Sequence, residues 1–482
     1  RKALKEVAES NMNMLRVWGG GIYEDEYFYD LCDSLGILVW QDFMFACAMY
    51  PGDDVFMESV ELEATQQIKR LRKHPSIALW CGNNENSEGW NRWGWQADRS
   101  EEEINSIWGD YQNLFNKLLP SLVDSLSTTN YWESSPQYGR GNPKHQFTGD
   151  AHYWGVWHDA EPFENFEKKV PRFMSEYGFQ SFPEMDAIEL YALEEDFDLD
   201  SEVMKVHQKH PRGNSLIQEY ILRDFKEPAD FESFVYLSQI VQAEGMRIGM
   251  EAHRRARPYN MGTLYWQFND CWPVASWSSR DYYGNWKALQ YTAKNAYEDL
   301  LISTIQTEDS VSIYLINDEN VKHEFDLLIE HIDYTGVTLG SKAKYITIRE
   351  SSSTLIHSIA LDDFLYIDSI ENKSYLDIQV LQNGEVQARK LHHFVKTKDM
   401  ELPFTGISYK VEKDSIGFIL ELFSDAFMKD VMINSLHDGR FEDNYFDLPA
   451  DEHRRIRFYN DYPMEEFNTN NLTFFSIVDT YD

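Results

Sequence analysis

The chain has 482 residues, of which 43% are hydrophobic and 26% are charged, as in an ordinary globular protein. Asp and Glu number 81 against 44 Lys and Arg, which gives a formal net charge of −37. This composition excludes a disordered chain or a fibre, and its negative charge argues against nucleic-acid binding. No apolar run approaches the ~18 residues of a membrane-spanning helix, so we expect no membrane insertion. The length predicts more than one domain.

The chain opens inside a helical pattern, because Arg1 starts the stretch RKALKEVAESNMN without an initiator Met or a signal sequence. We therefore expect further sequence upstream, and targeting signals cannot be sought here. The sequence does not fix the localisation. A periplasmic or other extracytoplasmic location is favoured over the cytoplasm.

Short apolar runs alternate with helical stretches over the first 300 residues, which is typical of parallel βα units. Four stretches between the runs carry helical patterns, at 25–35, 57–73, 104–125 and 234–257, and the last of them ends in the cations HRRAR. The apolar runs are seven predicted strands, at 14–18, 37–40, 77–82, 131–134, 150–154, 172–177 and 263–268.

A (β/α)₈ barrel needs eight strands, and seven are found here. Because the stretch before Met14 is helical, we expect the missing strand to be the first one, upstream of Arg1. The predicted fold class is therefore α/β, with a catalytic (β/α)₈ TIM barrel over residues 1–300 that lacks its first strand in this chain.

The periodicity changes to two after about residue 300, in segments such as SVSIYLIND and IGFILELF. Alternation of this kind, between turn residues, predicts antiparallel β-sandwiches. A break at 398–403 divides the region. We predict an immunoglobulin-like sandwich over 301–400 and a second C-terminal sandwich over 401–482.

All 14 tryptophans lie between Trp18 and Trp286, and all four cysteines lie in the same part of the chain. The cysteines have apolar neighbours in a chain too large to need disulfides. We interpret them as buried thiols rather than as a disulfide framework or a metal site.

Two carboxylates stand at the C-terminal ends of predicted strands. Glu85 follows IALWCGNN, and Glu176 follows RFMS. Barrels of this type carry their active sites on that face. If the missing strand is the first, these residues fall on strands four and seven, whose ends can face each other across the barrel mouth. The alternative is that both are ordinary surface acids of an acidic chain.

Cleavage of a glycosidic bond gives a reason for two carboxylates. One protonates the leaving oxygen, and the other acts on the opposite side of the anomeric carbon. A separation of about 5–5.5 Å permits direct attack with retention of configuration, whereas about 6.5–9.5 Å leaves room for water and gives inversion. A like charge and an aromatic lining would raise the pKa of the acid.

Aromatic residues gather at the same predicted strand ends. Trp18 and Trp266 each end a strand, and Trp90, Trp93 and Trp95 follow Glu85 closely. Sugar rings present apolar C–H faces that stack on aromatic rings. A single Trp would most simply be a core residue, but several at one barrel mouth indicate a sugar site.

Five motifs resemble those of β-mannosidases of glycoside hydrolase family 2, in the same order and across the first 300 residues. The β-rich tail resembles the C-terminal immunoglobulin-like domains of that family, whereas its two N-terminal β domains have no counterpart here. The motifs are NMNMLRVWGGGIYE (11–24), ILVWQDFMFACAMYP (37–51), LWCGNNENSEGW (79–90), FMSEYGFQSFP (173–183) and GTLYWQFNDCWP (262–273).

The resemblance implies a role for each matching residue. It makes Glu85 the general acid/base and Glu176 the nucleophile of a retaining mechanism. Asn84 would bind the 2-hydroxyl of the sugar, and Arg16 would support the nucleophile and keep it ionised. The other residues expected in the pocket are Trp18, Trp266, Trp93, Asp42, His152 and Tyr153.

The resemblance thus implies an exo-acting β-mannosidase whose substrate is a β-mannoside oligosaccharide. The alternatives are a β-glucosaminidase or β-galactosidase of the same family, and a carbohydrate-binding fragment without catalysis. We expect no cofactor and no metal, because two carboxylates suffice for this reaction. Linkage preference, chain-length preference and oligomeric state are not encoded in any recognisable motif.

Overall fold

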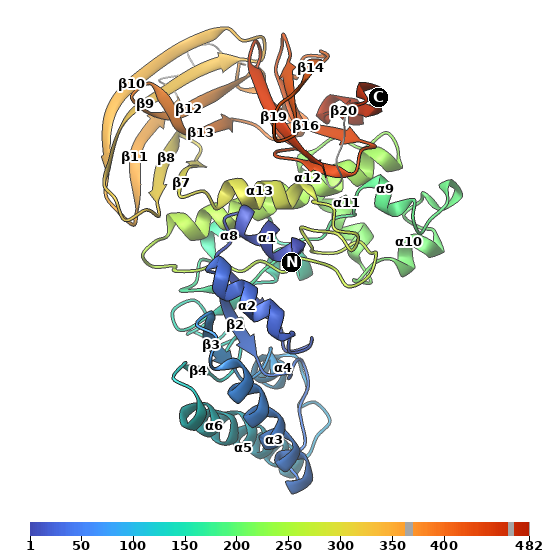
Figure 1. Cartoon of the computed structure of the whole chain (residues 1–482), viewed down its shortest axis with the longest axis vertical. Helices are drawn as coiled ribbons and strands as arrows, with labels where there is room; N and C mark the ends of the chain where they lie inside the picture. The colour runs from blue at the N-terminus through green and yellow to red at the C-terminus, as the bar shows by residue number, and fades with distance from the viewer. Residues whose placement is uncertain (362–369, 461–466, 482) are drawn as a thin grey trace. The chain divides into compact units, whose positions relative to one another are not determined.

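The computed structural model describes residues 1–361, 370–460 and 467–481 (Figure 1). The chain forms two compact units. The first comprises Arg1–Tyr177 and Tyr259–Trp266, and the second comprises Gly178–Pro258 and Gln267–Asp482. This division does not follow the predicted domain limits at 300 and 400, which stay predictions.

The first unit is built on parallel strands, as the alternating pattern predicts. One sheet has the order β1-β2-β3-β4, a second pairs β5 with β6, and Thr263 adds a parallel bridge to Met174. Six of the seven predicted runs therefore form parallel strands, and those predictions are confirmed. The seventh run, 263–268, contributes only the single bridge at Thr263 and is not confirmed as a strand. The strands are β1 (Met14–Val17), β2 (Leu38–Asp42), β3 (Ile77–Cys81), β4 (Tyr131–Trp132), β5 (Ala151–His152) and β6 (Met174–Glu176).

Helices of the first unit begin where the sequence supplies capping side chains. Asp25 accepts a hydrogen bond from the backbone N–H of Phe28 at 3.1 Å, and Ser100 forms a reciprocal capping box with Glu103. The helices are α1 (Lys2–Glu9), α2 (Glu26–Leu35), α3 (Asp54–Leu71), α4 (Asn86–Arg92), α5 (Glu101–Asn113), α6 (Leu119–Leu126), α7 (Gly155–His158) and α8 (Asn165–Lys168).

The predicted helix at 104–125 is one continuous right-handed run with a defect in the middle. A π-helical turn, Leu114–Leu118, separates α5 from α6. Pro120 stands in the first turn of α6 and has no N–H to donate to the preceding turn. The sequence therefore predicts the run of helix but not this wider turn.

Helices of the second unit include α12 (Phe231–Arg255), whose 25 residues match the predicted helix at 234–257. Its last turn carries His253, Arg254 and Arg255, and such cations suit the negative C-terminal end of a helix. The remaining helices are α9 (Met185–Ile188), α10 (Glu202–Val206), α11 (Gly213–Asp224) and α13 (Ala288–Ala296).

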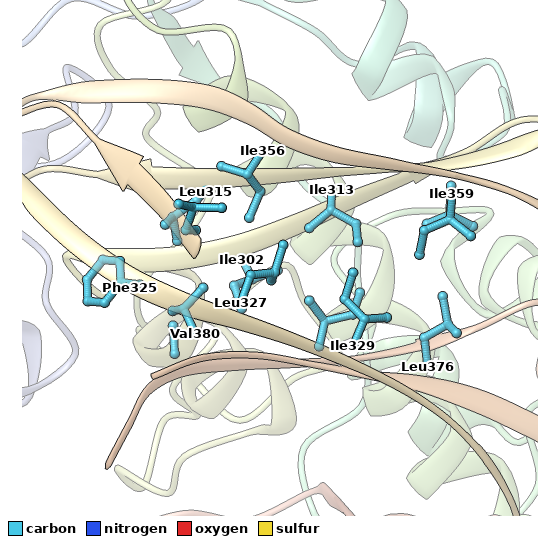
Figure 2. Packing of buried hydrophobic residues seen from close by; sticks show 14 of the residues in the cluster. Ile302, Ile313, Leu315, Phe325, Leu327, Ile329, Ile356, Ile359, Leu376 and Val380 are labelled. Carbon is cyan, nitrogen blue, oxygen red and sulfur yellow. The ribbon is translucent and has the colours of Figure 1, made fainter. Parts of the chain in front are cut away.

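A first antiparallel sandwich follows α13 in the second unit. Its two sheets have the orders β10-β9-β12-β13 and β11-β8-β7. Alternate residues of the facing strands form a dry core that includes Ile313, Leu327 and Ile329, as Figure 2 shows. The strands are β7 (Leu300–Gln306), β8 (Ser310–Asn317), β9 (His323–Asp333), β10 (Thr338–Ile348), β11 (Ser352–Ala360), β12 (Ser374–Gln382) and β13 (Glu385–His393).

A second antiparallel sandwich ends the chain. Its sheets have the orders β14-β15-β19-β17 and β18-β16-β20, and strict alternation of burial along β15 matches the predicted period of two. The strands are β14 (Ser408–Lys413), β15 (Phe418–Phe423), β16 (Met428–Ser435), β17 (Gly439–Phe441), β18 (Phe446–Leu448), β19 (His453–Asn460) and β20 (Leu472–Phe475).

The four cysteines are unpaired, as predicted, but only two of them are buried. Cys32 and Cys81 lie in the interior, whereas Cys47 and Cys271 are exposed. The expectation of four buried thiols is therefore wrong for the latter two, which lie in loops after strands rather than in the apolar runs themselves. Among the described residues, no helix has both the length and the apolar character needed to cross a bilayer.

Candidate active site

The backbone beyond strand β3 places Glu85 at the end of the first sheet. Asn84 forms parallel bridges with Ala46 on one side and Ser135 on the other, and the N–H of Glu85 donates to the carbonyl of Ser135 at 2.9 Å. Glu85 itself adopts the left-handed conformation, with φ 61°, and directly precedes helix α4. Non-glycine residues held in this region cost on the order of 1–3 kcal/mol, and such positions cluster at functional sites.

Glu176 is the last residue of β6, and its side chain contacts Arg16 from strand β1. The guanidinium Nη1 of Arg16 donates to Glu176 Oε1 at 2.7 Å. Both side chains are about 94% buried, with 6% of each exposed. The ion pair is therefore largely shielded from solvent. Charge interactions are stronger in such a buried environment than in water.

Arg16 is held by two further side chains. Its Nη2 donates to Asp42 Oδ2 at 2.9 Å and to Asn84 Oδ1 at 2.7 Å. Asp42 is fully buried and also accepts from Trp40 Nε1 at 2.9 Å. Burial alone would lower the pKa of Arg16, but Asp42 and Glu176 raise it above its ordinary value, so the guanidinium stays charged.

Gly19 shows why the glycine run follows strand β1. Its N–H donates to Asp42 Oδ2 at 3.0 Å. A β-carbon at this position would stand 2.5 Å from the carbonyl oxygen of Phe45 and 2.7 Å from that of Phe43. Only glycine therefore allows the backbone to come close enough to bind this carboxylate.

His152 contacts both candidate carboxylates. Its Nδ1 lies 2.8 Å from Glu85 Oε1 and 3.3 Å from Glu176 Oε2. Its Nε2 lies 2.9 Å from Ser135 Oγ. The imidazole is 99% buried, and burial lowers the pKa of His152 below its ordinary value. The ring is therefore neutral near pH 7.

Burial acts on both Glu85 and Glu176. Burial raises the pKa of Glu85 to about 7, against the opposing effect of Arg16. Burial likewise raises the pKa of Glu176 to about 7, while His152 and Arg16 lower it and Glu85 raises it. Since Arg16 contacts Glu176 directly, Glu176 is the carboxyl group that ionises first, and Glu85 keeps its proton.

The spacing of the pair is short. One oxygen of each carboxylate and a ring nitrogen of His152 all lie within 4.8 Å of one another. Oxygens no more than 4.8 Å apart are closer to the separation of about 5–5.5 Å for direct attack than to the roughly 6.5–9.5 Å that accommodates a water. Three such donors could also hold a cation. The expectation of no metal therefore stays a prediction that a chelation experiment must test.

Trp18 and Trp266 come together as the motifs predict. Their ring centroids are 5.1 Å apart with an interplanar angle of 70°, an edge-to-face arrangement. Both are half-buried, so part of each ring faces solvent. The pair supplies an aromatic surface in the same unit as the carboxylates.

Two predicted pocket residues point elsewhere. The hydroxyl of Tyr153 donates to Glu161 rather than to the carboxylate pair. Trp93 is 46% exposed after α4 and packs edge-on against Trp95, with ring centroids 5.6 Å apart. Within the described part of the chain, Trp93 makes no hydrogen bond to the carboxylates. The structure therefore brings Arg16, Asp42, Asn84, Glu85, His152 and Glu176 into one polar cluster without these two.

Some residues of the cluster were not singled out from the sequence as members of the pocket. Cys47, in the loop after β2, places its Sγ 3.6 Å from Glu85 Oε2. Asp150 and Ser135 stand behind His152. Asp150 could be found from its place at the start of a strand two residues before His152, whereas Ser135 and Cys47 carry no signal beyond their position after strands.

Comparisons with known proteins agree with this architecture. The family description "Mannosidase Ig/CBM-like domain" matches residues 309–399, and "Ig-fold domain" matches residues 402–480. A crystal structure of the β-D-mannosidase from Dictyoglomus thermophilum superposes with a TM-score of 0.89 at 35% identity, over 98% of this chain and 57% of that one. An Amycolatopsis orientalis exo-chitosanase shares only the fold, with a TM-score of 0.70 at 14% identity over 94% of this chain and 57% of that one.

Curated sequences extend the likeness. A goat (Capra hircus) β-mannosidase is 34% identical over 95% of this chain and 55% of its own length. β-Mannosidase B of Thermothelomyces thermophilus is 41% identical over 60% of this chain and 35% of its own length. The chain thus spans little more than half the length of the longer matches.

The fold class predicted from the sequence is confirmed: the chain has the fold of a (β/α)₈ glycoside hydrolase barrel followed by immunoglobulin-like domains. The resemblance read from the five motifs is confirmed as well. The relatives that it matches at 30–41% identity are β-mannosidases, and the chain covers between about a third and three fifths of their length.

Proposed function

We propose that this chain carries the catalytic site of a retaining exo-β-mannosidase, which removes terminal non-reducing β-D-mannose from oligosaccharides. The observation that carries the proposal is the buried Glu85–Glu176 pair, with donor oxygens within 4.8 Å and a cation against only one member. The choice of mannose rests on the names of the relatives, which are β-mannosidases.

In the first step, Glu176 attacks the anomeric carbon while Glu85 gives its proton to the leaving oxygen. The glycosidic bond breaks, and a covalent bond forms between the sugar and a Glu176 oxygen. Arg16 keeps Glu176 ionised before attack. In the second step, Glu85 takes a proton from water, the hydroxide attacks the same carbon, and Glu176 leaves as a carboxylate.

Asn84 is placed to bind the sugar next to the reacting carbon. Its Oδ1 accepts from Arg16, which fixes the amide so that Nδ2 faces Glu85 Oε2 at 3.3 Å. The 2-hydroxyl of mannose is axial, and a contact to it would strengthen as the ring distorts toward the oxocarbenium-like transition state. Trp18 and Trp266 provide a stacking surface for the apolar face of the ring.

A panel of 4-nitrophenyl glycosides tests the substrate. We expect the β-D-mannoside to be hydrolysed with the highest kcat/KM. Faster hydrolysis of the β-glucosaminide or β-galactoside would replace mannose with that sugar and leave the two-carboxylate chemistry intact. Binding of mannosides without turnover of any member of the panel would favour a carbohydrate-binding role instead.

Two variants test the roles of the carboxylates. Glu176→Ala should lose nearly all turnover on every substrate, because it removes the attacking carboxylate. Glu85→Ala should lose about 10²–10⁴-fold on the 4-nitrophenyl mannoside but much less on a 2,4-dinitrophenyl mannoside, whose leaving group needs no proton. Azide should restore turnover in Glu85→Ala and yield β-mannosyl azide. Full activity in both variants would refute the assignment.

A further inference from the structure

Asp150 is a buried carboxylate that is connected to the candidate catalytic pair through Ser135 and His152. It precedes strand β5 and is 3% exposed. Its Oδ1 accepts from Trp132 Nε1 at 2.9 Å, and its Oδ2 accepts from the hydroxyls of Ser135 at 2.7 Å and Ser175 at 2.6 Å. These three donors are neutral, and among the described residues no cation forms an ion pair with Asp150, although a buried carboxylate usually has one.

Ser135 links Asp150 to His152. Its Oγ lies 2.7 Å from Asp150 Oδ2 and 2.9 Å from His152 Nε2. A hydroxyl has one proton to donate, and a carboxylate is a stronger acceptor than an imidazole nitrogen. Ser135 therefore donates to Asp150, and its lone pair is left to accept a hydrogen bond from His152. Arg16 Nη1 also lies 3.5 Å from His152 Nε2, but its shorter bond is to Glu176 Oε1 at 2.7 Å, so Ser135 at 2.9 Å is the nearer partner of Nε2. With Ser135 as the acceptor, the proton of the neutral imidazole is on Nε2.

The other ring nitrogen is then an acceptor. Nδ1 of His152 faces Glu85 Oε1 at 2.8 Å, closer than Glu176 Oε2 at 3.3 Å. An imidazole lone pair at 2.8 Å repels an ionised carboxylate and accepts a hydrogen bond from a protonated one. Arg16 binds Glu176 and offsets its charge, and Glu176 is the more distant carboxylate from Nδ1, so the proton required opposite Nδ1 is on the nearer Glu85.

We propose that Asp150, acting through Ser135, is a positioning residue that holds His152 in its Nε2-protonated tautomer and thereby keeps the acid proton on Glu85. The proposal rests on the proposed glycosidase function for its kinetic consequence, because it identifies what keeps the general acid loaded. Asp150 and Ser135 act through His152 and not by contact with the substrate or the reacting atoms.

Asp150→Asn should reverse the direction of the whole hydrogen-bond chain. The amide oxygen stays opposite Trp132 Nε1–H, so the NH₂ group takes the place of Oδ2 and donates to Ser135. Ser135 then turns its own proton toward His152 Nε2. The imidazole proton moves to Nδ1, from which it stabilises ionised Glu85. A near-isosteric change thus selects the wrong tautomer, as happens when the aspartate of a serine-protease triad is replaced by asparagine.

Several other charged or titratable groups face His152 and must be kept constant. They are Glu85 and Glu176 at the two strand ends, Arg16 on β1, Glu88 on α4, and His145 in the loop before Asp150. Asp150→Asn also removes a negative charge, which by itself favours ionised Glu85. Ser135→Ala retains that charge and removes only the hydroxyl between Asp150 and His152. The two variants together therefore separate the effect of the imidazole tautomer from the effect of the charge.

The kinetic test is the pH dependence of kcat/KM on the 4-nitrophenyl β-D-mannoside. We expect the alkaline limb, which reports loss of the acid proton, to move down by about one pH unit or more in both Asp150→Asn and Ser135→Ala. Ser135→Thr should restore the wild-type limb. Ser175→Ala is the matched control, because Ser175 also binds Asp150 Oδ2 and, among the described residues, has no hydrogen bond to the imidazole; its hydroxyl lies 3.5 Å from that of Ser135.

A second readout does not depend on activity. Nitrogen-15 NMR of the histidine-labelled protein distinguishes the two tautomers, and the His152 signals are those missing from His152→Gln. We expect the proton on Nε2 in the parent and in Ser175→Ala, and on Nδ1 in Asp150→Asn. A proton on Nδ1 in the parent, or an unmoved alkaline limb in both folded variants, would overturn the proposal. If no glycoside is hydrolysed, the proposed function fails and the NMR result still decides the tautomer.

Discussion

Arg16 offers a direct test of the electrostatics of the site, because it is the cation that contacts the candidate nucleophile. Its Nη1 lies 2.7 Å from Glu176 Oε1, which places the two charge centres about 4 Å apart. At an effective dielectric constant of about 20, that separation corresponds to about 4 kcal/mol, or about 3 pKa units. Arg16→Met should therefore raise the pKa of Glu176 well above the value of about 7 that it has beside the guanidinium.

The sign of the effect follows from the mechanism. Glu176 must be ionised to attack, so a higher pKa of Glu176 moves the acid limb of the kcat/KM profile toward higher pH, by about one to three units. The same substitution strips Asp42, which is fully buried, of its ion-pair partner. Breaking a buried pair in this way costs about 3–5 kcal/mol of stability, so the melting temperature should fall as well.

Two further variants keep this prediction interpretable. Arg16→Lys keeps the charge but loses the planar fork that reaches Glu176, Asp42 and Asn84 together, so the acid limb should move less than in Arg16→Met while turnover still falls. Lys73→Met removes an exposed cation paired with Glu26 and should leave stability nearly unchanged. An unmoved acid limb in folded Arg16→Met would refute the assignment of Glu176 as the ionised nucleophile.

Three other predictions follow from separate parts of the molecule. Gly19→Ala should lower the melting temperature and turnover together, since its β-carbon would press on the carbonyl of Phe45; an unchanged melting curve would contradict the close approach. Leu327→Ala should cost about 2–5 kcal/mol in denaturant unfolding of the first sandwich, whose core it fills, whereas a loss below 1 kcal/mol would mean that this core repacks. Dialysis against a chelator should leave kcat unchanged; a loss that Zn²⁺ restores would show that Glu85, His152 and Glu176 hold a cofactor.

The positions of the carboxylates could be predicted because strand periodicity is a strong local signal. Parallel strands end on one face of a barrel, so a Glu just after an apolar run lies on that face whatever the details of packing. Glu85 and Glu176 follow this rule. The π-helical turn at Leu114–Leu118 did not follow from periodicity, because its hydrogen bonds depend on how the chain continues into Pro120.

The orientation of individual side chains was harder to predict. His152 and Tyr153 were both expected in the pocket, yet neighbouring residues on a strand point to opposite faces. The β5–β6 pairing shifts register between Ala151 and His152, which places His152 opposite Glu176. His152 turns toward Glu85 and Glu176, and Tyr153 turns toward Glu161. A shift of this kind leaves no trace in residue spacing.

The chemistry of the site depends on an asymmetry that neither carboxylate has on its own. Burial raises the pKa of both glutamates to about the same value, so burial cannot decide which is the acid and which the nucleophile. The difference comes from neighbours on other strands: a permanent cation against Glu176 and a neutral imidazole against Glu85. Arg16 is fixed by Asp42, and the imidazole is fixed by Ser135 and Asp150. Each role is therefore set by a second carboxylate, Asp42 for Arg16 and Asp150 for His152, so substitutions of Asp42 and of Asp150 should move the two limbs of the pH profile separately.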